Sequence, residues 1–247
     1  MRRRSYPRGR TLLKAKPWYE RDGGERLARD RQVIAEPYPD LSYRIDREAE
    51  RAYLGGSITL RSDCGIRTKI DLKVVFPYSY PKLEPRAYDV AGKFRHVPDR
   101  HFYPDGCCCL WLPPESLWDA DDPNGLRVFL NHVSIFFDKQ LICDALGGNA
   151  WPGEARSHGY LGYVEFVQEM LKGNKELMTT LAPIFAKERS ISRNDLCPCG
   201  RGFKFKRCHL DAVEEVSRRV GISTLRDTFR AWDRHASASD KLQAGII

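Results

Sequence analysis

The sequence predicts an α+β protein with a small zinc-binding appendage. Three observations lead to this fold class: a helical segment near the N-terminus, a series of segments with strand-like alternation, and helical periodicity in the second half of the chain. A compact group of cysteines near the C-terminus predicts the appendage. At 247 residues, the chain is long enough for one sizeable domain and such an addition.

The expected elements follow one another as a helix, four strands and further helices. The first helix is expected over 19–35, because Pro37 and Pro39 end it. Short links between the strands favour an antiparallel meander, with a hairpin turn at Asp63-Cys64-Gly65 and either a weak point or a bend at Gly55-Gly56. The strands are expected at 41–45, 52–60, 67–75 and 87–90, and the later helices at 125–144, 160–185 and 212–232.

Positive charge is concentrated in two stretches of a chain whose formal net charge is +8. The first, residues 1–17, contains no acidic residue and is expected to be a flexible basic arm, and the second is 193–207. Such clusters bind nucleic-acid phosphates or acidic protein surfaces, but a solvated arm is the favoured interpretation. No window approaches the roughly 18 apolar residues of a membrane span, and the arm lacks the apolar core of a secretory signal. We therefore expect a cytoplasmic protein with no membrane partner.

The cysteines fall into groups that do not suggest a disulfide scaffold. Eight cysteines are spread over 247 residues, as Cys64, the run 107–109, Cys143 and a final group of three. Three consecutive cysteines suit a reducing compartment, where thiols are available for metal binding or catalysis.

The final group has the composition of one tetrahedral zinc site. Cys197 and Cys199 are separated by a proline, and eight residues separate Cys199 from the pair Cys208-His209. Three thiolates and an imidazole form a complete ligand set for structural zinc. The alternative is a set of reduced cysteines with no metal, which the compact spacing disfavours.

The surrounding residues resemble the SEC-C motif, a short appendage of many bacterial proteins. The resemblance covers residues 193–209, from Arg-Asn-Asp-Leu-Cys-Pro-Cys-Gly to Lys-Arg-Cys-His. It implies binding of a protein or ribosome partner, and not catalysis. We therefore expect a SEC-C zinc motif over 189–212, followed by a C-terminal helix and tail over 213–247.

A second group of chemically active side chains lies between His101 and Leu110. It combines a histidine, a turn-forming Pro-Asp-Gly sequence and the run Cys107-Cys108-Cys109. Thiol catalysis and metal binding are both open, although neighbouring cysteines cannot easily all point at one ion. Burial of small side chains in an irregular segment is a third interpretation.

The segment upstream of the cysteine run resembles the ubiquitin-conjugating (UBC-like) fold. It has the pattern Phe76-Pro77-x-x-Tyr80-Pro81-x-x-x-Pro85, and the resemblance covers roughly 19–172. In that family a glycine stands three places before the nucleophilic cysteine and a leucine follows it. Gly106 and Leu110 match these places, and this register selects Cys109. The resemblance implies a UBC-like domain over 18–188.

The resemblance further implies an activity, a set of partners and a second site residue. Cys109 would accept a ubiquitin-like modifier from an activating enzyme as a thioester, and an amine of a target protein would receive it. His101 stands where the family has an asparagine, and it would donate to the oxyanion, act as a base or serve as a turn residue. Bacterial relatives in antiphage conjugation operons carry such a histidine. The alternatives are an inactive UBC-like scaffold or adaptor that binds a partner through the zinc motif and, less favoured, a nucleic-acid-binding protein.

Overall fold

The computed structural model describes residues 15–61, 67–148, 151–153, 156–172, 175–186 and 190–235. Almost all of the expected basic arm, the expected hairpin turn at Asp63-Cys64-Gly65 and the end of the C-terminal tail lie outside these residues. Contacts divide the chain into two compact units. Unit 1 contains the described residues up to Cys108 together with Leu117–Ile142. Unit 2 contains Cys109–Ser116 and the described chain from Cys143 onward.

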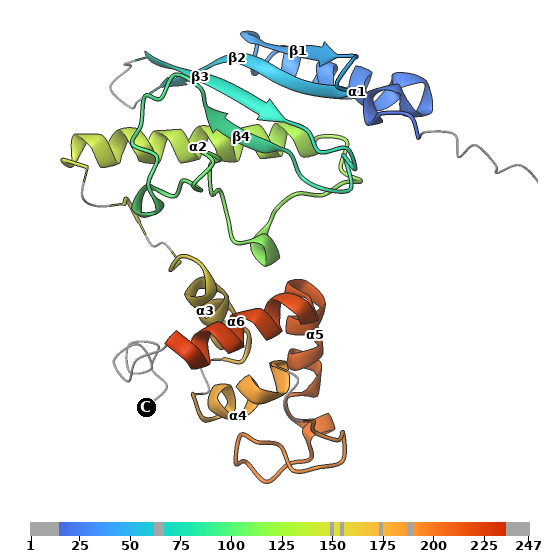
Figure 1. Cartoon of the computed structure of the whole chain (residues 1–247), viewed down its shortest axis with the longest axis vertical. Helices are drawn as coiled ribbons and strands as arrows, with labels where there is room; N and C mark the ends of the chain where they lie inside the picture. Colours follow the sequence, from blue (N-terminus) through green and yellow to red (C-terminus); the bar gives the residue numbers. More distant parts are fainter. Residues whose placement is uncertain are drawn as a thin grey trace, which may run out of the picture. The chain divides into compact units, whose positions relative to one another are not determined.

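Unit 1 is built around a four-stranded antiparallel sheet (Figure 1). Adjacent strands pair in the order β1-β2-β3-β4, so the predicted meander is confirmed, as is the α+β class. The strands are β1 (Leu41–Asp46), β2 (Arg51–Arg61), β3 (Arg67–Val75) and β4 (Arg86–Asp89).

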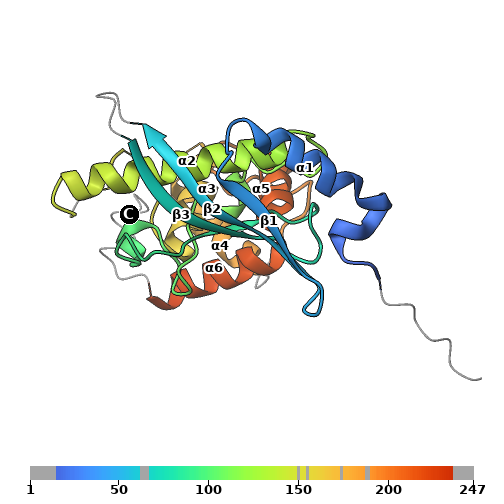
Figure 2. The same cartoon turned by 90° about the horizontal axis from the view of Figure 1, so that it is seen from above.

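One face of the sheet forms the core of unit 1 together with a long helix. Alternate side chains of the strands are buried, as Leu54 and Ile58 of β2 and Leu72 of β3 illustrate. Helix α2 (Gly125–Ala145) runs beneath the sheet in both views (Figures 1 and 2) and contributes buried aromatic and aliphatic residues such as Phe137. The buried side chains of the strands, which recur at every second residue, thus face the buried side chains of α2.

The N-terminal helix is shorter than the sequence predicted. A 3-10 segment, η1 (Trp18–Gly24), precedes helix α1 (Glu25–Ala35), and Gly23 and Gly24 at the end of η1 have φ values of 68° and 84°. A left-handed backbone conformation breaks the helical hydrogen bonding, so the expected single helix is two elements.

The Gly55-Gly56 pair does not interrupt strand β2. Gly56 has a φ of 143° and pairs with Leu41 on one side and Leu72 on the other. A Cβ atom at Gly56 would lie 2.0 Å from the backbone oxygen of Asp40. The glycine is therefore needed for close approach of the chain that enters β1.

The proline-rich segment after β3 adds an aromatic cluster to the core of unit 1. The ring of Tyr80 lies 4.6 Å from that of Trp18 and 4.8 Å from that of Phe76, measured between centroids. Trp118 packs against Tyr80 at 5.5 Å, and its indole Nε1 donates to the backbone oxygen of Pro81 at 2.8 Å. The aromatic residues of the proline-rich pattern are thus held together within unit 1.

A buried carboxylate anchors this aromatic cluster to helix α1. The hydroxyl of Tyr80 donates to Asp30 Oδ2 at 2.7 Å, and Arg26 Nε lies 3.0 Å from Asp30 Oδ1. Burial raises the pKa of Asp30, while the hydrogen bond from Tyr80 and the charge of Arg26 oppose that rise. Because Asp30 is fully buried, its stability as an anion depends on these two partners and on the Tyr43 hydroxyl, which donates to Oδ2 at 3.4 Å.

Unit 2 is a group of helices with its own apolar core. Helix α6 contacts each of the other three main helices, and the core includes Phe166, Leu181 and Phe229. The elements of unit 2 are η3 (Pro113–Glu115), α3 (Tyr160–Met170), α4 (Lys175–Phe185), η4 (Phe205–Arg207), α5 (Leu210–Val220) and α6 (Ile222–His235).

Unit 2 differs from the sequence-based expectations in two ways. The helices expected over 160–185 and 212–232 are each two helices, because the chain turns at Leu171–Lys172 and at Gly221, where φ is 84°. The contact units also divide the chain at a place other than the expected boundary at residue 188. Helices α3 and α4 belong to the same apolar core as the zinc motif.

The length and polarity of the helices bear on whether one of them could cross a membrane. Among the residues that the structure describes, no helix is both long enough and apolar enough to span a bilayer.

Replacing Tyr80 with phenylalanine should destabilise unit 1, because Asp30 would remain buried without its closest hydrogen-bond donor. We expect Tyr80→Phe to lower the free energy of unfolding by about 1–3 kcal/mol in chemical denaturation. Tyr78→Phe is the matched control, since the half-exposed Tyr78 hydroxyl donates only to the backbone oxygen of Ala15 near the surface. Equal stability of the two variants would contradict the anchoring role of Tyr80.

Candidate metal centre and thiol segment

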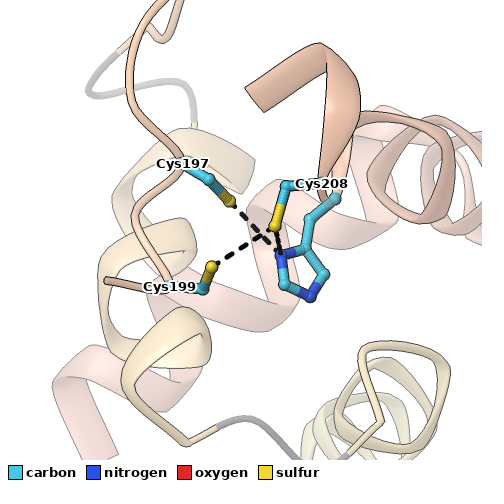
Figure 3. Close-up of side chains that lie close together, drawn as sticks. Cys197, Cys199 and Cys208 are labelled. Atoms are coloured by element: carbon cyan, nitrogen blue, oxygen red, sulfur yellow. Dashed lines mark hydrogen bonds between the residues drawn. The ribbon is translucent and has the colours of Figure 1, made fainter. Parts of the chain in front are cut away.

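Three cysteines and one histidine converge in unit 2 (Figure 3). Cys197 Sγ lies 3.3 Å from His209 Nδ1, Cys199 Sγ lies 3.4 Å from Cys208 Sγ, and Cys208 Sγ lies 3.2 Å from His209 Nδ1. All four ligand atoms lie within 4.8 Å of one another. Ligand atoms on a tetrahedron around zinc are separated by about 3.5–3.8 Å, given bonds of about 2.0–2.3 Å. The arrangement is therefore compatible with zinc.

A tight backbone turn brings the first two cysteines into this position. The amide of Cys197 donates to the oxygen of Phe203 at 2.7 Å, and the amide of Phe205 donates to the oxygen of Asp195 at 2.8 Å. Gly200 and Gly202, with φ values of 75° and 77°, complete the turn between these pairings. The other two ligands lie between η4 and α5, so the turn and the start of α5 meet at the site.

Ionisation of the clustered thiols requires a compensating positive charge. Burial and the neighbouring Cys199 and Cys197 thiols raise the pKa of Cys208 to about 12. Burial lowers the pKa of His209, which favours the neutral imidazole that metals bind. Three adjacent thiols ionise together only where positive charge compensates them. A metal held by four protein ligands has no open position, so this centre suits a structural role.

The three cysteines of the run have different environments. Cys107 and Cys108 are only 3% and 5% exposed, and each forms an isolated β-bridge, with Tyr88 and Phe102 respectively. Cys109, in contrast, is half-buried and belongs to unit 2. Cys107 and Cys108 therefore have a packing role in unit 1, and Cys109 is the more accessible thiol.

His101 lies at the end of a short 3-10 turn in unit 1. Its amide donates to the oxygen of Pro98 at 2.7 Å, and its φ is 54°. Asparagine and histidine tolerate this left-handed conformation better than most residues do. The contact division assigns His101 to unit 1 and Cys109 to unit 2, so the pairing of these two residues stays a prediction from the family resemblance.

A second histidine near the cysteine run was not singled out from the sequence. His96 Nε2 lies 3.2 Å from Asp89 Oδ2, an oxygen that also accepts the amide of Phe94 at 3.0 Å. A Cβ atom at Gly106 would lie 3.3 Å from His96 Nδ1, so this imidazole supports the turn before the cysteines. The available signal was an acidic residue at an inward position of the fourth strand.

Comparison with known proteins identifies the zinc motif and little else. The family model of the SEC-C motif matches residues 193–211, which confirms the expected motif. The protein translocase subunit SecA of Chloroflexus aggregans (strain MD-66 / DSM 9485) is 44% identical over 45 residues, 18% of this chain. The chain spans only 4% of the length of that relative. No solved structure matches the chain.

Removal of two ligands should abolish metal binding. We expect about one zinc ion per purified wild-type chain and almost none in the Cys197→Ser, Cys199→Ser double variant, measured by elemental analysis. Cys109→Ser is the control and should keep its zinc. Undiminished zinc in the double variant would exclude this site.

Proposed function

We propose that the chain is a ubiquitin-conjugating-type transferase that carries a ubiquitin-like modifier as a thioester on Cys109. The observation that carries this proposal is the contrast within the cysteine run. Cys107 and Cys108 are buried and their backbones form isolated β-bridges, whereas Cys109 is half-buried. The more accessible thiol is the same one that the Gly106-Leu110 register selects.

The architecture of unit 1 supports the same proposal. A helix precedes a four-stranded antiparallel meander, and a long helix follows the cysteine segment. Tyr80 and Phe76 of the proline-rich pattern are buried, and Trp118 donates a hydrogen bond to Pro81. These features agree with a UBC-like fold, which the proposal assumes.

The chemistry follows from a thiolate nucleophile. The Cys109 thiolate attacks the thioester between the modifier and its activating enzyme, forms a new carbon–sulfur bond and releases the thiolate of the activating enzyme. A target amine then attacks the same acyl carbon, forms an amide and expels the Cys109 thiolate, while the amine loses a proton. The negative oxygen of the tetrahedral intermediate requires a hydrogen-bond donor, and we assign this role to His101.

The zinc motif contributes partner recruitment to this proposal. A closed four-ligand centre gives no position for substrate, and SEC-C motifs are appendages that bind other proteins or ribosomes. Together with the histidine at position 101, the motif supports our proposal of a bacterial conjugation pathway of the antiphage type, with the cytoplasm as its compartment. The second candidate is an adaptor that keeps the UBC-like fold and binds a partner through the zinc motif, without forming a thioester.

A thioester assay with the cognate activating enzyme, the modifier and ATP tests the proposal directly. We expect an adduct on non-reducing gels that thiols remove and that is absent in Cys109→Ser. Cys107→Ser and Cys108→Ser are matched controls and should keep the adduct, because their side chains serve packing. Persistence of the adduct in Cys109→Ser would refute the nucleophile. A wild-type chain that binds the modifier without forming an adduct would favour the adaptor.

Substitution of His101 tests the assigned hydrogen-bond donor. His101→Ala should slow transfer from a preformed thioester to free lysine by about 10²-fold or more, because one oxyanion donor is lost. His101→Asn should restore most of that rate, since asparagine donates a hydrogen bond and tolerates the same backbone conformation. Single-turnover discharge measures both rates. A His101→Asn variant as slow as His101→Ala would indicate a base instead.

A further inference from the structure

The segment Cys109–Ser116 is fastened to the unit that carries the zinc motif. The chain leaves unit 1 after Cys108, belongs to unit 2 for this segment, and returns to unit 1 at Leu117. Leu112 packs against the apolar core of unit 2, and its Cδ1 lies 3.6 Å from the position of a Cβ atom at Gly162 in α3. The candidate nucleophile is thus the first residue of a segment that unit 2 holds.

An ion pair of Arg156 with Glu115 is the first contact that holds the segment. Arg156 Nε donates to Glu115 Oε2 at 2.6 Å, and its Nη2 donates to Glu115 Oε1 at 2.5 Å. The same guanidinium binds Glu169 of α3 at 2.8 and 2.6 Å. A bidentate pair fixes orientation as well as distance, and both side chains of the Arg156–Glu115 pair are shielded, at 23% and 31% exposed. Glu115 is therefore oriented relative to α3.

A second arginine fastens the backbone of the same segment to α5. Arg219 Nη2 donates to the oxygen of Pro114 at 2.6 Å. Its guanidinium lies over the ring of Phe166, 5.1 Å from the centroid, and that of Arg156 lies 5.8 Å from the same centroid. Both arginines therefore contact one aromatic ring of α3, which orders them and makes their hydrogen bonds less costly to form.

Helix α5 connects this contact to the metal centre. It begins at Leu210, immediately after the ligands Cys208 and His209, and Arg219 stands in its last turn. A helix of 11 residues is about 16 Å long, and the buried Val213 and Val216 hold it in the core of unit 2. Anchoring its first turn at a metal therefore restricts the position of Arg219.

We propose that Arg219 and Arg156 are positioning residues for the Cys109 segment, and that zinc binding at the start of α5 fixes that segment in place. The zinc motif is then a brace for the candidate nucleophile in addition to a recruitment element. This inference rests on the proposed function only in the role that it gives to Cys109. Burial and the nearby Cys109 thiolate both raise the pKa of Tyr163 in α3. The first residue of the segment therefore lies close to a helix of unit 2.

Hydrogen exchange of the full chain, read by mass spectrometry, tests the brace. In the segment, the amide of Glu115 donates to Leu112 and that of Ser116 donates to Pro113. We expect Arg219→Ala to speed exchange of these amides about tenfold, because a charge-assisted hydrogen bond that holds the segment is lost. Arg219→Lys, which still donates to Pro114, should recover part of the protection.

Arg218→Ala is the matched control. Arg218 precedes Arg219 in the same helix and pairs with Glu215 at 2.9 and 2.6 Å, and its side chain is 72% exposed. This variant should exchange like wild type. Zinc content and near-ultraviolet circular dichroism of each variant establish that the fold is retained. Wild-type protection in a folded Arg219→Ala variant would overturn the proposal, as would equal loss of protection in Arg218→Ala.

Zinc removal and thiol alkylation separate this inference from the proposed function. Zinc removal by a chelator should speed hydrogen exchange in the segment and should speed alkylation of Cys109 by iodoacetamide. The alkylation rate of Cys107 in unit 1 should change little. Protection that survives complete zinc removal would overturn the link to the metal. Neither measurement involves the modifier, so an absent thioester with a zinc-dependent segment would refute the transferase and leave the brace standing.

Discussion

The convergence of four side chains at one point governs the structure of unit 2. Cys197, Cys199, Cys208 and His209 come from a short turn and from the start of α5, and their ligand atoms lie within 4.8 Å of one another. The turn has few apolar residues, so a cation bound by the thiols would supply much of the free energy that keeps it closed. Because Phe205 and the two buried cysteines also belong to the core of unit 2, the helices pack directly onto the metal centre.

Local patterns were sufficient to predict the secondary structure of the sheet. Alternation along the strands and the short links between them gave the order and direction of β1 to β4. The boundaries of the helices were harder to predict from the sequence. Gly221 and the turn at Leu171–Lys172 interrupt stretches whose apolar periodicity continues on both sides. A periodic pattern records which face is buried, and it does not record a change in the direction of the helix axis.

The candidate sites differ in how far sequence could predict them. Zinc ligands lie within 13 residues of one another, and their spacing is a local property that the SEC-C match confirms. The contacts of Arg156 and Arg219 join segments that are 41 and 105 residues apart. Surface-type residues such as arginine carry no periodic signal, so only the folded chain reveals these contacts. The assignment of 109–116 to unit 2 has the same origin.

The path of the chain limits how this protein can be divided into fragments. The backbone passes between the units at residues 108, 116 and 142, so neither unit is a continuous stretch of sequence. A fragment beginning at Cys143 would contain every zinc ligand, but Arg156 would lose Glu115 and the core would lose Leu112. Cleavage after residue 142 would similarly leave the segment Cys109–Ser116 attached to unit 1, without the helices that bind it. Either fragment therefore exposes surface that the contacts of Cys109–Ser116 cover in the intact chain.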